Sequence, residues 1–319
     1  MADLEQVKSG DDWERKTLEK VALAAIQEQR RRRHWGIFFK LLTFVYLFAL
    51  LFIGMGWIGK KDLAPGKHTA LVELSGVIAA SGSASADAVM TGLQDAFKDK
   101  RTQGVILRIN SPGGSPVQAG HINDEIRRLR AKHPNIPIYA VVEDICASGG
   151  YYVAVATDKI YVDKASIIGS IGVLMDGFGF TGTMEKLGVE RRLLAAGENK
   201  GFLDPFSPVN ESHKAHAEKM LDDIHRQFID VVRQGRGTRL KDGPGLFSGL
   251  MWTGQGSVDL GLTDALGSID YVAREVIKAE DIVDFTPKEN IAERVARRFG
   301  AAMAETLVRL GAAGSLSIR

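Results

Sequence analysis

From residue 69 onward, short apolar runs alternate with polar stretches that have helical spacing. The apolar runs predict strands at residues 69–74, 104–110, 136–142 and 159–162. The polar stretches predict helices at 84–98, 117–131 and 210–234, the last with one apolar stripe that we expect to pack on a sheet. Strands that alternate with helices are typical of a parallel sheet, so the chain is predicted to be an α/β protein.

The N-terminal part has a different pattern. Residues 41–58 form a run of 18 residues without a charge, and 35–39 extend it to the length that crosses a bilayer, about 20 residues. A buried core helix is the alternative interpretation, and so is a cleavable signal, although a 35-residue region rich in acids and bases is too long to precede one. We therefore predict a cytoplasmic segment at 1–35 and a transmembrane signal-anchor helix at 36–59.

Basic residues set the expected orientation of that helix. Four arginines at 30–33 precede the apolar run, and three lysines at 60, 61 and 67 follow it. This bias favours a cytoplasmic amino terminus, with the rest of the chain on the other side of the membrane.

After the anchor we expect one domain at 60–289 and an amphipathic basic tail at 290–319. The tail has apolar residues at helical spacing with arginines among them. It could lie on the membrane, contact a neighbouring subunit or cover its own domain, and the sequence leaves these three open.

Composition limits the function classes. An apolar fraction of 45% supports a packed core, and a net charge of +2 gives no reason to expect a nucleic-acid partner. The single cysteine, Cys146, excludes an internal disulfide and is expected to be buried as a small apolar side chain. The chain has no spacing typical of metal ligands, so we expect no metal and no cofactor.

Ser148 is the candidate nucleophile. It lies where the strand at 136–142 gives way to a helix beginning near Tyr151, and it is followed by Gly149 and Gly150. A hydroxyl on such a turn is exposed, and the two glycines allow close approach of a substrate beside a helix N-terminus that favours negative charge. The alternative is a serine that only caps the helix.

A second glycine-rich turn follows the strand at 104–110 and contains Gly113 and Gly114. The carboxyl ends of parallel strands meet at one rim of a sheet, so these amides are expected to face Ser148. They would then form an oxyanion hole, in which one donor contributes roughly 2.7–4 kcal/mol to acyl transfer. An ordinary turn is the alternative.

A serine needs a base to remove its proton. The seven histidines fit this role badly, and only His121 could reach the rim. Lys200 is the better candidate, because it follows a stretch expected to be a strand and lies among Gly, Phe, Leu and Pro that would exclude water. Burial favours a neutral amine, which can accept a proton.

Four ordered motifs carry a resemblance to a known family. They are Asn-Ser-Pro-Gly-Gly at 110–114, Ala-Ser-Gly-Gly-Tyr-Tyr at 147–152, Gly-Ser-Ile-Gly-Val at 169–173 and Gly-Glu-Asn-Lys at 197–200. Over roughly residues 69–283 the chain resembles the signal peptide peptidase A family of Ser-Lys peptidases, in its short single-domain form that includes SohB.

The resemblance implies a role for each matching residue. Ser148 is implied as the nucleophile and Lys200 as the general base. The amides of Gly114 and Ser148 are implied as the oxyanion hole, and Ser170 as the hydroxyl that orients the lysine. A hydroxyl can direct a flexible amine without adding charge, which gives Ser170 a physical reason for this role.

The implied fold is a ClpP/crotonase-like spiral of strand-strand-helix units that oligomerises. The implied protein is a single-pass serine endopeptidase of the bacterial inner membrane, with its catalytic domain on the periplasmic side. Its implied substrates are cleaved signal peptides or short unfolded segments of exported proteins. Two alternatives stay open: an acyl-CoA hydratase or lyase on the same scaffold, and a membrane scaffold without catalysis.

Overall fold

The computed structural model describes residues 2–54, 66–241 and 243–287, which divide into two units. The first unit holds helix α1 (Ala2–Gly54). Within α1, Glu19–Leu51 is long and apolar enough to cross a membrane, with a mean hydropathy of 1.7 in its most apolar window, and that window is fully exposed. The predicted anchor therefore lies on a continuous helix, while residues 55–59 of that prediction and the predicted tail at 290–319 lie outside the described residues.

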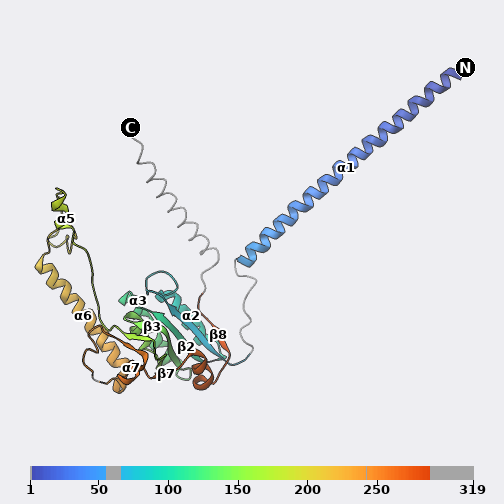
Figure 1. The fold of residues 1–319 in the computed structure, drawn as a ribbon. Coiled ribbons are helices and arrows are strands. Elements are labelled where there is room, and N and C mark those ends of the chain that lie inside the picture. The colour runs from blue at the N-terminus through green and yellow to red at the C-terminus, as the bar shows by residue number, and fades with distance from the viewer. Residues whose placement is uncertain (1, 55–65, 242, 288–319) are drawn as a thin grey trace. The chain divides into compact units, whose positions relative to one another are not determined.

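The second unit holds a sheet with helices around it (Figure 1). The sheet has eight strands in the order β6-β5-β3-β2-β1-β8, with β4 beside β3 and β7 beside β4. Every pair is parallel except β5 with β6. The α/β fold predicted from the alternating pattern is confirmed. The strands are β1 His68–Ser75, β2 Thr102–Ser111, β3 Ile138–Ala147, β4 Lys159–Val162, β5 Ile167–Gly169, β6 Met251–Thr253, β7 Ala265–Leu266 and β8 Ile282–Asp284.

Helices cover both faces of this sheet unequally. The larger core cluster joins α2, α3 and α4 to one face, and a smaller cluster joins the π-helical turn at Val272–Ile277 to the other. Alternate residues of β1 show this division, since Val72 faces the larger cluster and Leu71 the smaller. The helices are α2 Ala86–Lys98, α3 Pro116–Lys132, α4 Gly149–Ala154, α5 Thr181–Lys186, α6 Glu211–Arg236, α7 Gly254–Asp259 and α8 Ile269–Tyr271, with a short 3₁₀ turn at Gly237–Arg239.

Strand β3 changes partner along its length. Its first half pairs with β4, from Tyr139 to Val141, and its last three residues pair with β5. Ala147 is thereby in register with Gly169. Ser148 follows β3 and Ser170 follows β5, so the two serines emerge side by side at the carboxyl end of the sheet.

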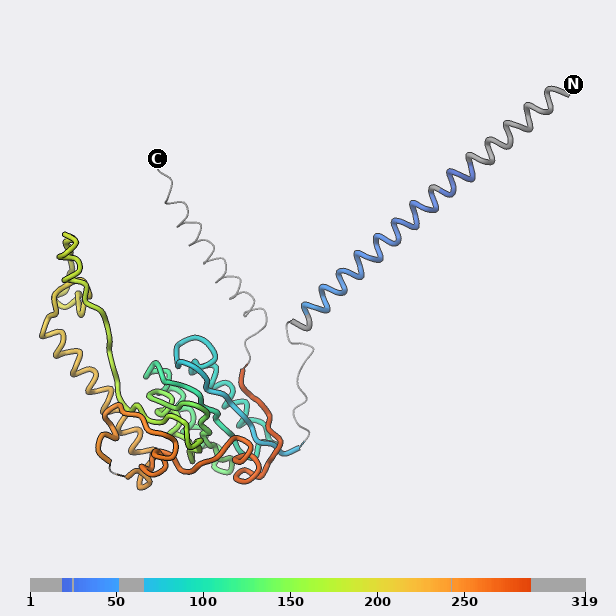
Figure 2. Tube along the Cα trace, in the orientation of Figure 1, coloured from blue at the N-terminus to red at the C-terminus, as the bar shows by residue number. Residues whose placement is uncertain are grey.

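After β5 the chain leaves the sheet, runs out to α5 and returns along α6 (Figure 2). We call residues 174–221 the lobe. The stretch before Leu193, expected to be a strand, has no regular structure. Helix α6 matches its predicted bounds, but only its C-terminal part packs on the domain, where Phe228 meets Tyr152 of α4 with ring centroids 5.2 Å apart. The expectation that the apolar stripe of α6 packs on the sheet is therefore wrong for the N-terminal half of the helix.

Candidate active site

Ser148 occupies a strained turn between β3 and α4. Its φ of +50° and ψ of −122° are rare for a residue with a side chain, and such strain costs about 1–3 kcal/mol. The turn is held by two backbone bonds: the Ser148 amide donates to the Gly169 carbonyl at 2.8 Å, and the Tyr152 amide donates to the Ser148 carbonyl at 2.9 Å. The side chain makes no cap bond to α4, so the interpretation of Ser148 as only a helix cap is wrong.

The predicted glycine turn lies against this serine. Gly113 and Gly114 have φ of +100° and +147°. Gly114 pairs with Ile78 in an isolated parallel bridge, and the Ile78 amide donates to the Gly113 carbonyl at 2.8 Å. A Cβ on Gly114 would lie 2.1 Å from the Ile78 carbonyl oxygen, and a Cβ on Gly113 would lie 2.8 Å from Ser148 Cβ. Both positions therefore require glycine, and the turn is fixed close to Ser148.

Two backbone amides are available beside Ser148. Within the described residues, nothing accepts a hydrogen bond from the N–H of Gly114 or of Gly149. The two lie close together, because a Cβ on Gly149 would be 3.3 Å from the Gly114 nitrogen. The Ser148 amide, predicted as the second oxyanion donor, is instead bonded to Gly169. Gly149 begins α4, and the first N–H groups of a helix have no partner within it, so its amide is the free one.

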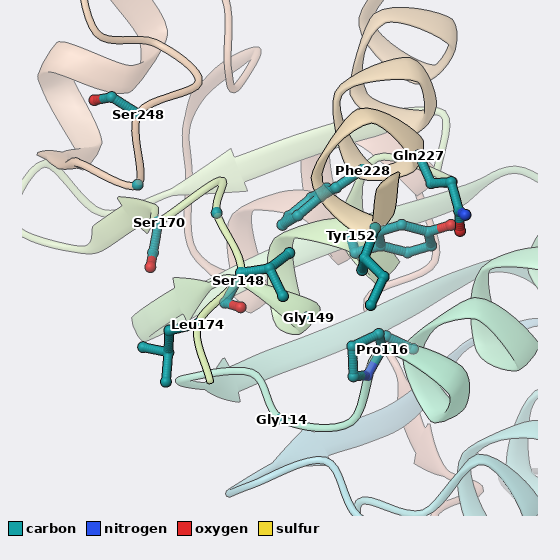
Figure 3. A pocket seen from close by; sticks show the side chains of 15 residues that line it. Gly114, Pro116, Ser148, Gly149, Tyr152, Ser170, Leu174, Gln227, Phe228 and Ser248 are labelled. Carbon is teal, nitrogen blue, oxygen red and sulfur yellow. The ribbon is translucent and has the colours of Figure 1, made fainter. Parts of the chain in front are cut away.

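Ser170 also adopts a left-handed conformation, with φ of +51°. Its amide donates to the Leu250 carbonyl at 2.7 Å, on the segment that leads into β6. Figure 3 shows the side chains of Ser148 and Ser170 facing the same hollow. Neither hydroxyl has a hydrogen-bond partner among the described residues, so both are free to meet an incoming group.

The hollow is a cavity of about 560 Å³ with a mostly apolar wall. Helices α3, α4 and α6 supply part of that wall through Ala119, Tyr152, Ile224 and Phe228. The lining contains no histidine and no carboxylate; it consists of Gly114, Pro116, Ala119, Ser148, Gly149, Tyr152, Ser170, Gly172, Val173, Leu174, Ile224, Gln227, Phe228, Ser248 and Gly249. A triad through His121 and an acyl-CoA lyase with carboxylate acid-base groups therefore find no support in this part of the described structure.

The other predicted residues at this turn lie behind the cavity. Gly113 and Gly150 are buried and do not line it; a Cβ on Gly150 would lie 3.0 Å from the Ser111 carbonyl oxygen. Cys146 is fully buried, as expected, and burial raises the pKa of its thiol. Among the described residues no group of His, Cys, Asp and Glu could hold a metal ion.

Lys200 does not line the Ser148 cavity. It is exposed in a turn of the lobe, and its neighbour Asn199 contacts His213 of α6, with Oδ1 and Nε2 3.0 Å apart. His213 and Phe228 are fifteen positions apart on α6, which separates them by about 22 Å at the helical rise per residue. The expectation that Lys200 is shielded from water is wrong for a single chain, which does not bring Lys200 to Ser148.

Several site residues were not anticipated from the sequence. Phe228 belongs to the predicted apolar stripe of α6, but nothing indicated that it would wall the cavity together with Tyr152. His225 Nε2 lies 3.1 Å from the Ile171 carbonyl oxygen and ties α6 to the residue after Ser170. The regular spacing of apolar residues in α6 was the only feature of the sequence that pointed to this helix.

Taken together, a free serine hydroxyl on a strained strand-to-helix turn, with two free amides beside it on a parallel α/β sheet, is the arrangement of a serine hydrolase. The model of peptidase family S49 matches residues 130–283, which include Ser148, Ser170 and Lys200.

Relatives extend this match. The chain is 47% identical over 177 residues to a Brucella melitensis protein named Na(+)/H(+) antiporter NhaA, and the match covers 56% of the chain but 24% of that protein. It is 31% identical over 202 residues to a Synechocystis protein that has a protease name, covering 63% of the chain and 70% of that protein. It is 29% identical over 247 residues to an Enterococcus faecium protein named as a signal peptide peptidase SppA, covering 74% of the chain and 71% of that protein.

The chain belongs to peptidase family S49, so the resemblance drawn from the four motifs is confirmed. It spans about a quarter of the Brucella protein.

Proposed function

We propose that this protein is a membrane-anchored serine endopeptidase in which Ser148 is the nucleophile and Lys200 of a second copy is the general base. The observation that carries the proposal is the free Ser148 hydroxyl, which opens into a cavity beside the unpaired amides of Gly114 and Gly149. The strained backbone supports it, because such strain is concentrated at functional sites.

The reaction follows from these groups. The Ser148 oxygen attacks the carbonyl carbon of the scissile peptide while its proton passes to the neutral Lys200 amine. The negative charge that develops on the carbonyl oxygen is stabilised by the N–H groups of Gly114 and Gly149. The lysine then donates its proton to the leaving amine, and the C–N bond breaks. Water, deprotonated by the same amine, hydrolyses the acyl-enzyme and regenerates the serine hydroxyl.

A second copy is proposed as the source of the lysine because one chain keeps the two residues apart. The Lys200 turn is attached to the start of α6 at His213, whereas the Ser148 cavity is lined by Phe228 near the other end of that helix. The lobe that carries Lys200 also exposes large apolar side chains, with Leu174 79%, Phe178 80% and Leu194 97% exposed. Large apolar side chains with this much exposure are expected at an interaction site when they gather on one surface. Contact with a neighbouring chain would bury the lobe and remove water from the amine, which favours its neutral form.

Ser170 is proposed to orient the incoming amine. Its hydroxyl faces the same hollow as that of Ser148 (Figure 3) and can accept a hydrogen bond from, or donate one to, a neutral amine. This would direct the lysine lone pair toward the serine proton.

The substrate class follows from the wall of the cavity. Its apolar lining suits apolar side chains of an extended peptide, such as a signal peptide left in the membrane or an unfolded segment of an exported protein. We propose that α1 anchors the protein in the bacterial inner membrane with its amino terminus in the cytoplasm. The arginines at 30–33 support this orientation, which puts the catalytic unit on the periplasmic side.

The proposal is tested by labelling the full-length protein in detergent with a fluorophosphonate and by following cleavage of a fluorogenic peptide. Ser148→Ala is expected to abolish labelling and cleavage, and Lys200→Ala to reduce both strongly. Ser248→Ala, in the wall of the same cavity, and Lys214→Ala, on the same lobe, are the matched controls and are expected to keep both. Full activity of Ser148→Ala would refute Ser148 as the nucleophile, and a wild-type protein that neither takes the label nor cleaves the peptide would support a scaffold without catalysis.

A further inference from the structure

The turn that carries Lys200 has little backbone support of its own. The Lys200 amide donates to the Gly197 carbonyl and the Phe202 amide donates to the Asn199 carbonyl, both at 3.1 Å. Residues 191–200 are all exposed. A turn with so few contacts needs an external anchor if its central side chain is to keep one position.

That anchor is His213, which contacts the residues on both sides of Lys200. Its Nε2–H donates to Asn199 Oδ1 at 3.0 Å. Its ring also packs on Phe202, with centroids 5.2 Å apart and an interplanar angle of 45°. His216, three residues further along α6, meets the Phe202 ring edge-on at 5.8 Å and has no hydrogen bond to the turn in the described part of the chain.

His213 is itself held in place at the start of α6. Asn210 caps this helix, and its Oδ1 accepts hydrogen bonds from the Ser212 amide at 2.9 Å and from the His213 amide at 3.4 Å. The backbone of His213 is therefore fixed in the first turn of α6. This gives a continuous connection from the α6 cap through His213 to Asn199 and the adjacent Lys200.

We propose that His213 is a positioning residue for catalysis, holding the Lys200 turn in the conformation that reaches the Ser148 cavity of the neighbouring copy. The inference rests on the proposed function, in which Lys200 is the base. His213 does not line the Ser148 cavity, so it acts through Lys200 and not on the substrate. Loss of the anchor lowers the fraction of time for which the amine is correctly placed, and a displacement of about 1 Å can cost 100-fold in rate.

The experiment compares kcat and KM of full-length variants in detergent. His213→Ala is expected to lower kcat about tenfold and to leave KM within about twofold, because substrate binding is untouched. Asn199→Ala, a change on an exposed turn that cannot disturb the core, is expected to lower kcat by the same factor. The double variant is expected to be no slower than His213→Ala alone, since His213→Ala already removes the bond to Asn199.

Two further variants separate positioning from general damage. His213→Gln retains an N–H at the reach of Nε2 and is expected to restore kcat to within about threefold of the wild type. His216→Ala removes a ring contact with Phe202 but not the Asn199 bond and is expected to keep kcat. Thermal unfolding and molecular mass of each variant are measured alongside to verify folding and assembly.

The outcomes distinguish this inference from the proposed function. If Lys200→Ala is inactive but His213→Ala and Asn199→Ala keep the wild-type kcat, Lys200 stands as the base and the positioning role of His213 is overturned. If Lys200→Ala keeps full activity, both proposals are overturned. A loss in His213→Ala that His213→Gln does not restore, or that His216→Ala shares, would also refute the inference.

Discussion

Gly113→Ala is the substitution that tests the geometry of the proposed oxyanion hole most sharply. Gly113 has φ of +100°, and the new Cβ would lie 2.7 Å from the Gly149 nitrogen, 2.8 Å from Ser148 Cβ and 2.9 Å from the Ala147 carbonyl oxygen. None of these atoms belongs to a flexible side chain that could give way. The turn must therefore move away from Ser148 and take the Gly114 amide with it.

The magnitude follows from the donor that is displaced. Losing one oxyanion donor costs about 2.7–4 kcal/mol of transition-state stabilisation, or roughly 10²–10³ in kcat. The left-handed conformation adds about 1–2 kcal/mol of strain for a residue with a Cβ, which lowers the free energy of unfolding. We therefore expect a folded protein with a slightly lower Tm and a kcat reduced by at least about a hundredfold.

The assay is cleavage of a fluorogenic peptide, with thermal unfolding measured on the same samples. Gly120→Ala is the matched control, because Gly120 lies inside α3 and a Cβ there meets nothing within 4 Å. It is expected to keep kcat and to gain up to about 1 kcal/mol in unfolding free energy. A Gly113→Ala protein with a kcat within about twofold of the wild type would refute the placement of these amides.

Two more predictions concern stability and assembly. Burial opposes ionisation of Asp264, but hydrogen bonds and charge from Arg236, and a bond from the Ile160 amide, outweigh it and hold the pKa of Asp264 below its usual range. Stability from this group is present above the unfolded value of about 3.9 and is lost as the pH falls toward the folded pKa. Asp264→Asn is expected to lower the free energy of unfolding by about 3–5 kcal/mol at neutral pH, because the buried Arg236 loses its charged partner. Between pH ~5 and ~3 this variant is expected to lose less stability than the wild type does. Urea unfolding at several pH values checks both. Leu194→Glu is expected to keep Tm but to lower the molecular mass of the assembly, measured by light scattering, and the peptidase activity. Unchanged mass and activity would contradict the proposed contact of the lobe with a neighbouring chain.

The sequence predicted the sheet and the serine turn well because each has a local cause. The apolar runs around β2 and β3 are buried on both faces, and the glycines at 113 and 114 occupy positive-φ positions that few other residues tolerate. The apolar runs and the glycines are local features, so they can be recognised from residues that are close together in the sequence. The bounds of β2, α3 and α6 accordingly agree with the predicted ranges to within two residues.

The lobe was predicted poorly for a physical reason. Leu193 and Leu194 are among the apolar residues expected to keep water from Lys200, yet they are 45% and 97% exposed in a single chain. An apolar residue in the sequence does not reveal whether its own chain or a neighbouring chain covers it. The same limit applies to Lys200, since its motif identifies the residue but not the subunit from which it would act. The bond of the Ser148 amide to Gly169 was also missed, because it depends on the register of β3 and β5.

The central claim, a serine and a lysine supplied by two copies of the chain, is tested most directly by complementation. Ser148→Ala and Lys200→Ala chains are co-expressed in equal amounts, and the mixed assemblies are purified and assayed with a fluorogenic peptide. If each site takes its serine from one copy and its lysine from the next, random mixing leaves about a quarter of the sites intact, so about a quarter of the wild-type activity is expected. Mixed assemblies as inactive as either variant alone would contradict this account.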